Sequence, residues 1–271
     1  MHRAAYVLIA SLAGCDTVWG LERPDAGPAT DPNDEDGDGI ANSLDPCPHL
    51  DDQTQTDTDK DGIPEICDSD DNEDQTVAVF FGFDSTTTST ALDIQGTTSS
   101  EVPGTITFGR LADGLDTITL KIVTAKTALI DVGYEILEDT VEADPPTGTY
   151  DEIGLYTANQ TYAKDMRGDV CFFGRLQGDI DSLYTELVEN DKSHQMKLTS
   201  GDLAGTSGRM RLLRTPARYE CGVFRTSLGM LGDSQDVGTL QAVPGRIGFS
   251  TERLIVRLRY IYIAYQPLIR L

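Results

Sequence analysis

The chain has 271 residues and a formal net charge of −24, from 45 Asp and Glu against 21 Lys and Arg. So acidic a chain gives no reason to expect nucleic acid as a partner, because that partner requires a basic surface against its phosphates. The hydrophobic content of 39% is enough for a folded core.

The N-terminus predicts export and lipid anchoring. An Arg precedes an apolar run from Ala4 to Ala13, which is too short to span a bilayer. Leu12-Ala13-Gly14-Cys15 resembles a bacterial lipobox, which implies cleavage before Cys15 and acylation of that residue. An ordinary secretory signal or a short membrane segment is the alternative. We expect a lipoprotein signal peptide over 1–14, a flexible lipid-anchored tether over 15–30, and a bacterial cell-envelope location with the outer membrane or cell surface favoured over the periplasmic side.

Two acidic segments then repeat one spacing of carboxylates. In each, acids occupy positions one, three and five, Gly position six, Asn or Glu position nine, and Asp position twelve. Oxygen ligands at this spacing, bent around one cation by a glycine, suit Ca²⁺, to which position seven normally contributes its backbone carbonyl. The predicted calcium ligands are Asp34, Asp36, Asp38, Ile40, Asn42 and Asp45, then Asp57, Asp59, Asp61, Ile63, Glu65 and Asp68, with Asp70 and Asn72 as candidates to extend the second site.

The charge of this region explains why a cation would matter. Residues 31–75 hold 17 acidic residues and one Lys, a local net charge of −16. Their mutual repulsion predicts disorder unless divalent cations neutralise them and supply folding free energy. The alternative is a solvated acidic linker, against which the repeated register argues. Mg²⁺ is the weaker candidate because it retains its waters.

Both segments resemble thrombospondin type 3 repeats. The longer motif is similar to the stretch that ends in Asp45-Pro46-Cys47-Pro48, and the shorter to the one that ends in Glu65-Ile66-Cys67-Asp68. EF-hand and dockerin loops share the spacing, but they require flanking helices that the nearby prolines disfavour. The resemblance covers residues 31–75 and implies an extended calcium-wrapped stalk without a hydrophobic core. It also implies a disulfide between Cys47 and Cys67, worth about 3 kcal/mol on the chain-entropy estimate.

Residues 77–271 predict a second, larger domain. Short β-rich runs separated by turn residues indicate a mainly β fold, a two-sheet antiparallel jelly-roll sandwich, with a β-barrel or an immunoglobulin-like array as the competing architectures. In the last strand, alternation places Val256, Leu258, Tyr260 and Tyr262 on one face. The expected strands are 77–83, 104–111, 116–123, 128–137, 153–158, 170–176, 183–188, 195–198, 209–213, 219–224, 239–243, 246–249 and 254–265.

Two further cysteines, Cys171 and Cys221, lie within these expected strands. A second disulfide and two separate buried thiols are both consistent with their positions, because free Cys packs readily in cores. Under either interpretation, the cysteine usage favours an oxidising compartment.

The tail from Pro244 to Thr251, with the strand that follows it, resembles the closing hairpin of concanavalin A-like jelly rolls, a superfamily with laminin G-like and glucanase-like domains. Glycosidases of that superfamily use a Glu-x-Asp-x-x-Glu-like strand, and the nearest stretch here, Glu135 to Asp139, has the wrong spacing. With His194 as the only His of this region, neither a zinc site nor a serine triad can be assembled.

We therefore predict a calcium-binding, non-enzymatic envelope lipoprotein whose sandwich mediates adhesion or binds a glycan or protein ligand. The alternative is a carbohydrate-active enzyme whose site the sequence does not reveal. A basic strip is a candidate surface for an anionic partner; it comprises Arg209, Arg211, Arg214 and Arg218.

Overall fold

The computed structural model describes residues 33–70, 76–83, 91–99, 102–120, 123–140, 150–159, 169–176, 183–189, 192–199, 203–225, 229–236 and 244–267. Within these ranges the regular secondary structure is β-strand, without a helix, so the predicted mainly β fold is confirmed. The predicted signal peptide, the tether, Cys15, Asn72 and the expected strand at 239–243 lie outside the described residues.

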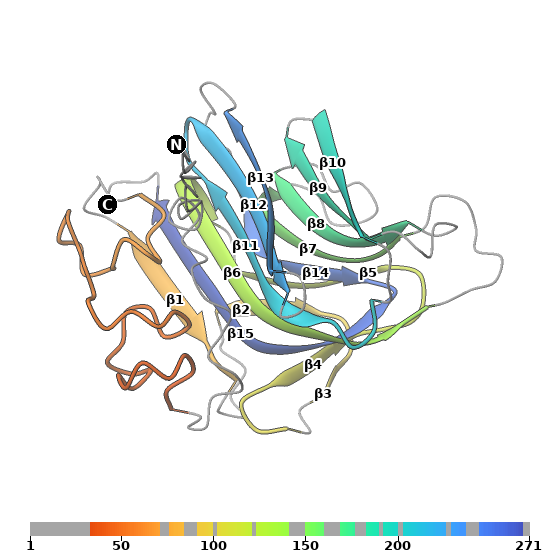
Figure 1. Ribbon diagram of the computed structural model, residues 1–271, viewed down its shortest axis with the longest axis horizontal. Coiled ribbons are helices and arrows are strands. Elements are labelled where there is room, and N and C mark those ends of the chain that lie inside the picture. The colour runs from red at the N-terminus through yellow and green to blue at the C-terminus, as the bar shows by residue number, and fades with distance from the viewer. Residues whose placement is uncertain are drawn as a thin grey trace, which may run out of the picture.

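The described strands form two antiparallel sheets packed face to face (Figure 1). The first, named here the β6 sheet, runs β13-β12-β11-β6-β15, with β1 and β4 on the other edge of β15 and β3 beside β4. Its strands are β1 (Val77–Phe81), β3 (Thr98–Ser99), β4 (Ile106–Gly109), β6 (Val123–Asp139), β11 (Ser207–Arg214), β12 (Arg218–Arg225), β13 (Gly229–Asp236) and β15 (Leu254–Pro267).

The second sheet, named the β7 sheet, runs β2-β5-β14-β7-β8-β9-β10. A short pairing of β14 with the start of β6 joins the two sheets at one corner. The strands of the β7 sheet are β2 (Leu92–Gln95), β5 (Leu115–Leu120), β7 (Tyr150–Asn159), β8 (Val170–Leu176), β9 (Leu183–Glu189), β10 (Lys192–Thr199) and β14 (Pro244–Glu252).

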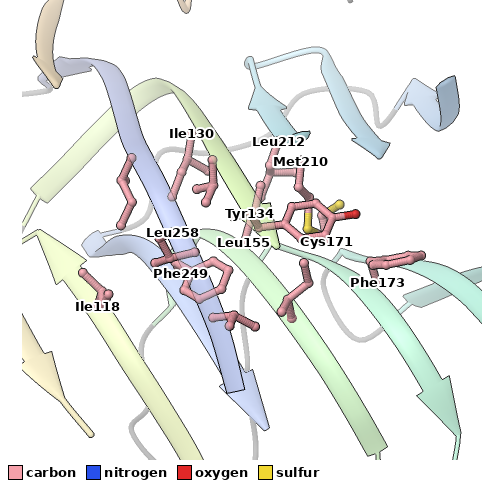
Figure 2. Close-up of a cluster of buried hydrophobic side chains, with 14 of the residues drawn as sticks. Ile118, Ile130, Tyr134, Leu155, Cys171, Phe173, Met210, Leu212, Phe249 and Leu258 are labelled. Carbon is pink, nitrogen blue, oxygen red and sulfur yellow. The ribbon is translucent and has the colours of Figure 1, made fainter. Parts of the chain in front are cut away.

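Alternate residues of both sheets meet in one hydrophobic core (Figure 2). Ile130 and Tyr134 of β6 lie on one side, and Leu155 of β7 and Phe249 of β14 on the other, all fully buried. Because successive side chains of a strand point to opposite faces, this alternation leaves the odd-numbered residues of β6 from Leu129 to Glu135 to face away from the core.

A bulge in β15 overturns one prediction from alternation. Val256 and Leu258 face the core between the sheets, as expected, but the register with β6 shifts between Leu258 and Tyr260. Beyond the shift, Ile261 and Ile263 face that core, whereas Tyr260 and Tyr262 pack in a separate cluster on the outer side of the β6 sheet. One extra residue in a strand reverses the face of every side chain that follows it, which a strict period of two does not anticipate.

Three strands were absent from the expected set: β2, β3 and β13. The sequence of β13, GMLGDSQD, consists largely of residues typical of turns. Pairing along the whole length of β12 holds this segment extended, so tertiary context overrides its local preference.

A disulfide between Cys171 and Cys221 joins β8 of one sheet to β12 of the other, across 50 residues of sequence. Both cysteines are buried in the core between the sheets. The structure thereby decides between the two interpretations that the sequence allowed.

Replacing Cys171 and Cys221 together by Ala is expected to lower the free energy of unfolding by about 4 kcal/mol, because the 50-residue loop would no longer be closed in the unfolded chain. For a domain of this size the corresponding fall in Tm is roughly 8–16 °C. Thermal unfolding of the full chain, with Cys47 and Cys67 unchanged, measures it. A fall below about 2 °C would show that the cross-link contributes little.

Candidate metal centres

The first set of regularly spaced carboxylates, from Asp34 to Asp45, is named here the first ladder. It folds into a tight loop whose carboxylates turn inward. Asp34 accepts hydrogen bonds from the backbone N–H groups of Gly37 (2.9 Å) and Gly39 (3.2 Å). Asp36 accepts one from Asp38 (3.1 Å), and Asp38 accepts one from Ile40 (2.7 Å). As a result, ligand oxygens of Asp34, Asp36 and Asp38 all lie within 4.8 Å of one another.

The second ladder, from Asp57 to Asp68, repeats this geometry. Asp57 accepts from the N–H groups of Lys60 (2.7 Å) and Gly62 (3.0 Å), and Asp61 accepts from Ile63 (2.9 Å). Oxygens of Asp57, Asp59 and Asp61 again lie within 4.8 Å of one another. Gly39 and Gly62, at position six of their loops, both have φ of 95°, a conformation that favours glycine.

Several carboxylate oxygens in these loops are buried without a hydrogen-bond partner in the described structure: Oδ2 of Asp36, Asp38, Asp45 and Asp59. Asp36, Asp38 and Asp45 are only 6%, 7% and 6% exposed. Burying carboxylates of like charge together is costly unless a cation neutralises them. Hard oxygen donors converging in this way fit Ca²⁺.

The raised pKa values of these carboxyl groups reflect the same cost of burying like charges together. Burial, reinforced by the neighbouring carboxylates of Asp38, Asp45 and Asp34, raises the pKa of Asp36 to about 7. Burial likewise raises the pKa of Asp45 to about 6, with Asp38 adding to the effect, and that of Asp68 to about 6, with Asp61 adding. Burial, with Asp61 and Asp57 adding, also raises the pKa of Asp59. The carboxylates of each ladder thus repel one another, and a bound cation would relieve that repulsion.

The remaining predicted ligands have other contacts in the structure. Asn42 accepts a hydrogen bond from the N–H of Glu35 (2.9 Å), and Glu65 accepts one from the hydroxyl of Thr58. The N–H of Asp70 donates to Asp68 (3.1 Å), and the side chain of Ile63 is buried against the sandwich. Metal ligation by these residues, and by the carbonyls of Ile40 and Ile63, stays a prediction.

The segment 33–70, named here the acidic segment, lies against the outer side of the β6 sheet, beside β1 (Figure 1). Its predicted disulfide, Cys47–Cys67, is confirmed and is buried there with Leu50 and Ile63 against strand residues. The strand residues in this second hydrophobic cluster are Leu129, Tyr260, Tyr262 and Ala264. The expected stalk without a hydrophobic core is therefore wrong for these residues, since the cystine and two aliphatic side chains supply an apolar face.

Hydrogen bonds fix the acidic segment at three more points. Arg211 of β11 donates to the carbonyl of Ile66 (3.2 Å), and the hydroxyls of Ser69 and Thr127 lie 2.9 Å apart. The N–H of Thr76, just before β1, donates to Oδ2 of Asp61 (2.9 Å), a predicted ligand. The second ladder is thus bonded directly to the chain that enters the sandwich.

Beneath the acidic segment lies a buried ion pair. Asp131 of β6 is fully buried and accepts hydrogen bonds from Nε and Nη2 of Arg209 on β11. Nε2 of His49, from the acidic segment, lies 3.7 Å from Oδ2 of Asp131, and the hydroxyl of Tyr260 lies 3.4 Å from Oδ1. Burial alone would raise the pKa of Asp131, but the charge and hydrogen bonds of Arg209 hold it well below its ordinary value.

The predicted basic strip has partners within the chain. Besides Arg209 with Asp131, Arg214 forms an ion pair with Asp169 (2.6 Å) and Arg218 with Glu220. The stretch that came nearest to a glycosidase motif is engaged in the same way, because Glu135 pairs with Arg257 (2.6 Å) and Asp139 with Arg175 (2.6 Å).

Sequence reasoning missed His49 and Asp131, because each stands alone in the sequence and their proximity depends on the docked acidic segment. The available signal was weak. Asp131 is the one charged residue in the apolar run from Ala128 to Tyr134, a position where a charge is normally paired.

In the part of the chain that the structure describes, a helix of the length and apolarity that a bilayer crossing requires does not occur. No protein family model matches the chain, and no curated protein matches its sequence.

The structure is nevertheless similar to solved lectins. Peanut lectin with a 9mer peptide is 14% identical, with 72% of this chain and 100% of that chain covered and a TM-score of 0.54. Winged bean acidic lectin complexed with methyl-α-D-galactose is 10% identical (71% and 99% covered, TM-score 0.53), and lectin UEA-II complexed with galactose is 10% identical (70% and 98% covered, TM-score 0.51). These likenesses confirm the fold, a legume lectin-like, concanavalin A-like β-sandwich.

Removing the carboxylate of Asp131 is expected to be strongly destabilising, because it leaves the buried guanidinium of Arg209 unpaired. Asp131→Asn should lower the free energy of unfolding by about 3–5 kcal/mol, measured by chemical denaturation of the full chain. The double change Asp131→Leu with Arg209→Met removes both charges and should recover most of that loss. A double variant no more stable than Asp131→Asn would contradict this account.

Proposed function

We propose that this protein is a calcium-binding lipoprotein of the bacterial cell envelope whose β-sandwich is a non-catalytic adhesion or ligand-binding module. The observation that carries the calcium proposal is the set of buried, unpartnered carboxylate oxygens in the two ladders. The ligands we assign are the carboxylates of Asp34, Asp36, Asp38 and Asp45 and those of Asp57, Asp59, Asp61 and Asp68. The resemblance of the two segments to thrombospondin type 3 repeats is part of this proposal.

The division of the chain is part of the proposal. A signal peptide over 1–14 would direct export. The acyl group on Cys15 and a tether over 15–30 would then hold residues 31–75 and the sandwich of residues 77–271 on the envelope, with the outer membrane or cell surface favoured. Two disulfides agree with the oxidising conditions of such a location. The ladders would then meet extracellular calcium, for which modules of this kind have dissociation constants on the order of 0.1–1 mM.

For the sandwich, we propose a glycan as the ligand, because the fold is that of lectins and the outer side of the β6 sheet carries the acidic segment. Near β2, the outer side of the β7 sheet carries polar groups. Arg246 of β14 forms an ion pair with Asp93 of β2 (2.9 Å), and both side chains are partly exposed there, near the hydroxyl of Thr119. Such groups are suited to the hydroxyls of a sugar.

The carbohydrate-active enzyme is the less favoured alternative. A glycosidase needs two carboxyl groups at the scissile bond. Glu135, Asp139 and Asp151 are each engaged by an Arg, respectively Arg257, Arg175 and Arg253.

Calorimetric titration of Ca²⁺ into the full chain carrying Cys15→Ser tests the ladders. Two ions are expected to bind saturably, and Asp36→Ala or Asp59→Ala should each weaken one site at least about tenfold, because each removes a charged ligand. Glu35→Ala is the matched control and should change little. Equal losses from all three changes would indicate diffuse attraction, and no saturable binding would make residues 31–75 an acidic linker.

The glycan proposal is tested on a glycan array with the same Cys15→Ser chain. Binding should fall at least about tenfold with Arg246→Ala, which removes a donor from the outer side of the β7 sheet. Arg257→Ala is the control, since Arg257 forms a similarly exposed pair with Glu135 on the other sheet. Equal effects of the two changes, or no glycan bound at all, would count against this face as a glycan site.

A further inference from the structure

The interface between the acidic segment and the sandwich is built around one histidine. The side chain of His49 is fully buried, with its ring stacked on Tyr262 at 4.2 Å between centroids and tilted against Tyr260 at 5.2 Å. Phe80 of β1 stacks at 6.5 Å. Among the described residues, neither ring nitrogen of His49 has a hydrogen bond of good geometry, and the nearest charge is Asp131 at 3.7 Å.

The surroundings of His49 favour its neutral form. Asp131 is paired with Arg209, so the attraction that it offers a protonated His49 is opposed by the charge of that guanidinium as well as by burial. Arg211, also on β11, adds another positive charge nearby, and Glu220 of β12 interacts with it. From β15 the titratable neighbours are the phenols of Tyr260 and Tyr262, while β1 contributes the uncharged Phe80.

The acidic segment itself brings two carboxylates toward this interface. Asp61 and Asp68 act electrostatically on Tyr262, whose hydroxyl is buried without a hydrogen-bond partner in the described structure. Burial raises the pKa of Tyr262 above its ordinary value, so this phenol stays neutral wherever His49 titrates. Protonation of His49 would therefore add a positive charge to those of Arg209 and Arg211, beside the buried carboxylate of Asp131 and within an apolar cluster.

We propose that His49 is an acid-sensitive latch: while its imidazole is neutral the acidic segment stays docked on the β6 sheet, and its protonation releases the segment. This goes beyond calcium binding and does not depend on it. The Cys47–Cys67 disulfide lies wholly within the acidic segment, so it would keep the released loops cross-linked but would not hold them to the sandwich.

The direction of the pH dependence follows from burial. Burial, and then Arg209 and Arg211, lower the pKa of His49 in the docked state, and the Asp131 carboxylate only partly opposes them. When undocked, the imidazole should titrate near its ordinary pKa of about 6.5. Docking is therefore fully supported above about pH 6.5 and loses up to about tenfold in its equilibrium constant for each pH unit below that value.

Release would also break polar contacts made by the C-terminal half of the acidic segment. The hydrogen bonds from Arg211 to Ile66 and between Ser69 and Thr127 would be lost, and the aromatic face of Tyr260 and Tyr262 would be uncovered. The bond from Thr76 to Asp61 would be loosened as well, so acid would detach the second ladder from the strand that leads into the sandwich.

Hydrogen exchange measured by mass spectrometry tests the latch on the full chain carrying Cys15→Ser, in excess Ca²⁺ and again in chelator. After correction for the chemical effect of pH, exchange in residues 44–56 should rise several-fold, up to about eightfold, between pH 7 and pH 5.5. In His49→Phe, which keeps a ring against Tyr262 but cannot be protonated, that rise should be absent. An equal rise in both proteins overturns the proposal, and the comparison holds in chelator even if no calcium binds.

A second measurement needs no variant. The chain has three histidines, and the imidazole of His49 can be followed by NMR in the wild-type protein. A docked-state pKa well below 6.5, with loss of the Tyr262 ring-current shift on protonation, supports the latch. A pKa at or above 6.5 in the docked state overturns it, whatever the fate of the His49→Phe protein.

Discussion

The packing of β15 on both of its sides is the constraint on which the assembly of this molecule depends. Before its bulge, Val256 and Leu258 enter the core between the sheets; after it, Ile261 and Ile263 do so, while Tyr260 and Tyr262 turn outward. Gly133 of β6 makes room for this change, because a Cβ there would lie 2.5 Å from the ring of Tyr260. One strand thus contributes to two hydrophobic clusters and joins the acidic segment to the sandwich.

The second hydrophobic cluster, in which the acidic segment packs on Tyr260 and Tyr262, lies beside the buried ion pair of Asp131 with Arg209. Hydrophobic contact alone would hold the cystine and Leu50 against the sheet without specifying their orientation, because such contact is non-directional. Direction comes from the polar contacts between sheet and segment, namely the hydrogen bond from Arg211 to the carbonyl of Ile66 and the contact of the Ser69 and Thr127 hydroxyls. Beneath the segment, Asp131 and Arg209 form an ion pair within the sheet. A buried ion pair is weak evidence for net stability, but it penalises every arrangement that leaves one charge unpaired.

How far the sequence predicts this structure depends on the range of the interactions involved. The strands rich in apolar residues typical of β-structure, such as 128–137 and 170–176, were predicted because their composition is local. Strand β13 and the bulge in β15 were not, because pairing with distant strands determines both. The carboxylate ladders are local too, and the structure brings Asp34, Asp36 and Asp38 together as their spacing predicts. His49 and Asp131 lie far apart in the chain, so their contact follows only from the docked arrangement.

The docked arrangement also changes what metal binding can do for the rest of the molecule. In a free-standing stalk, a bound cation would stabilise only its own loop. Here Asp61 accepts a hydrogen bond from Thr76, and Cys47 and Cys67 pack on Tyr260 and Tyr262, so unfolding the sandwich from β15 would also remove the surface that orders the loops. A cation that binds only the ordered loops therefore stabilises the docked protein as a whole, by about 1.4 kcal/mol for each site at ten times its Kd. Since β15 spans both clusters, metal binding to the loops would be coupled to the stability of the core between the two sheets.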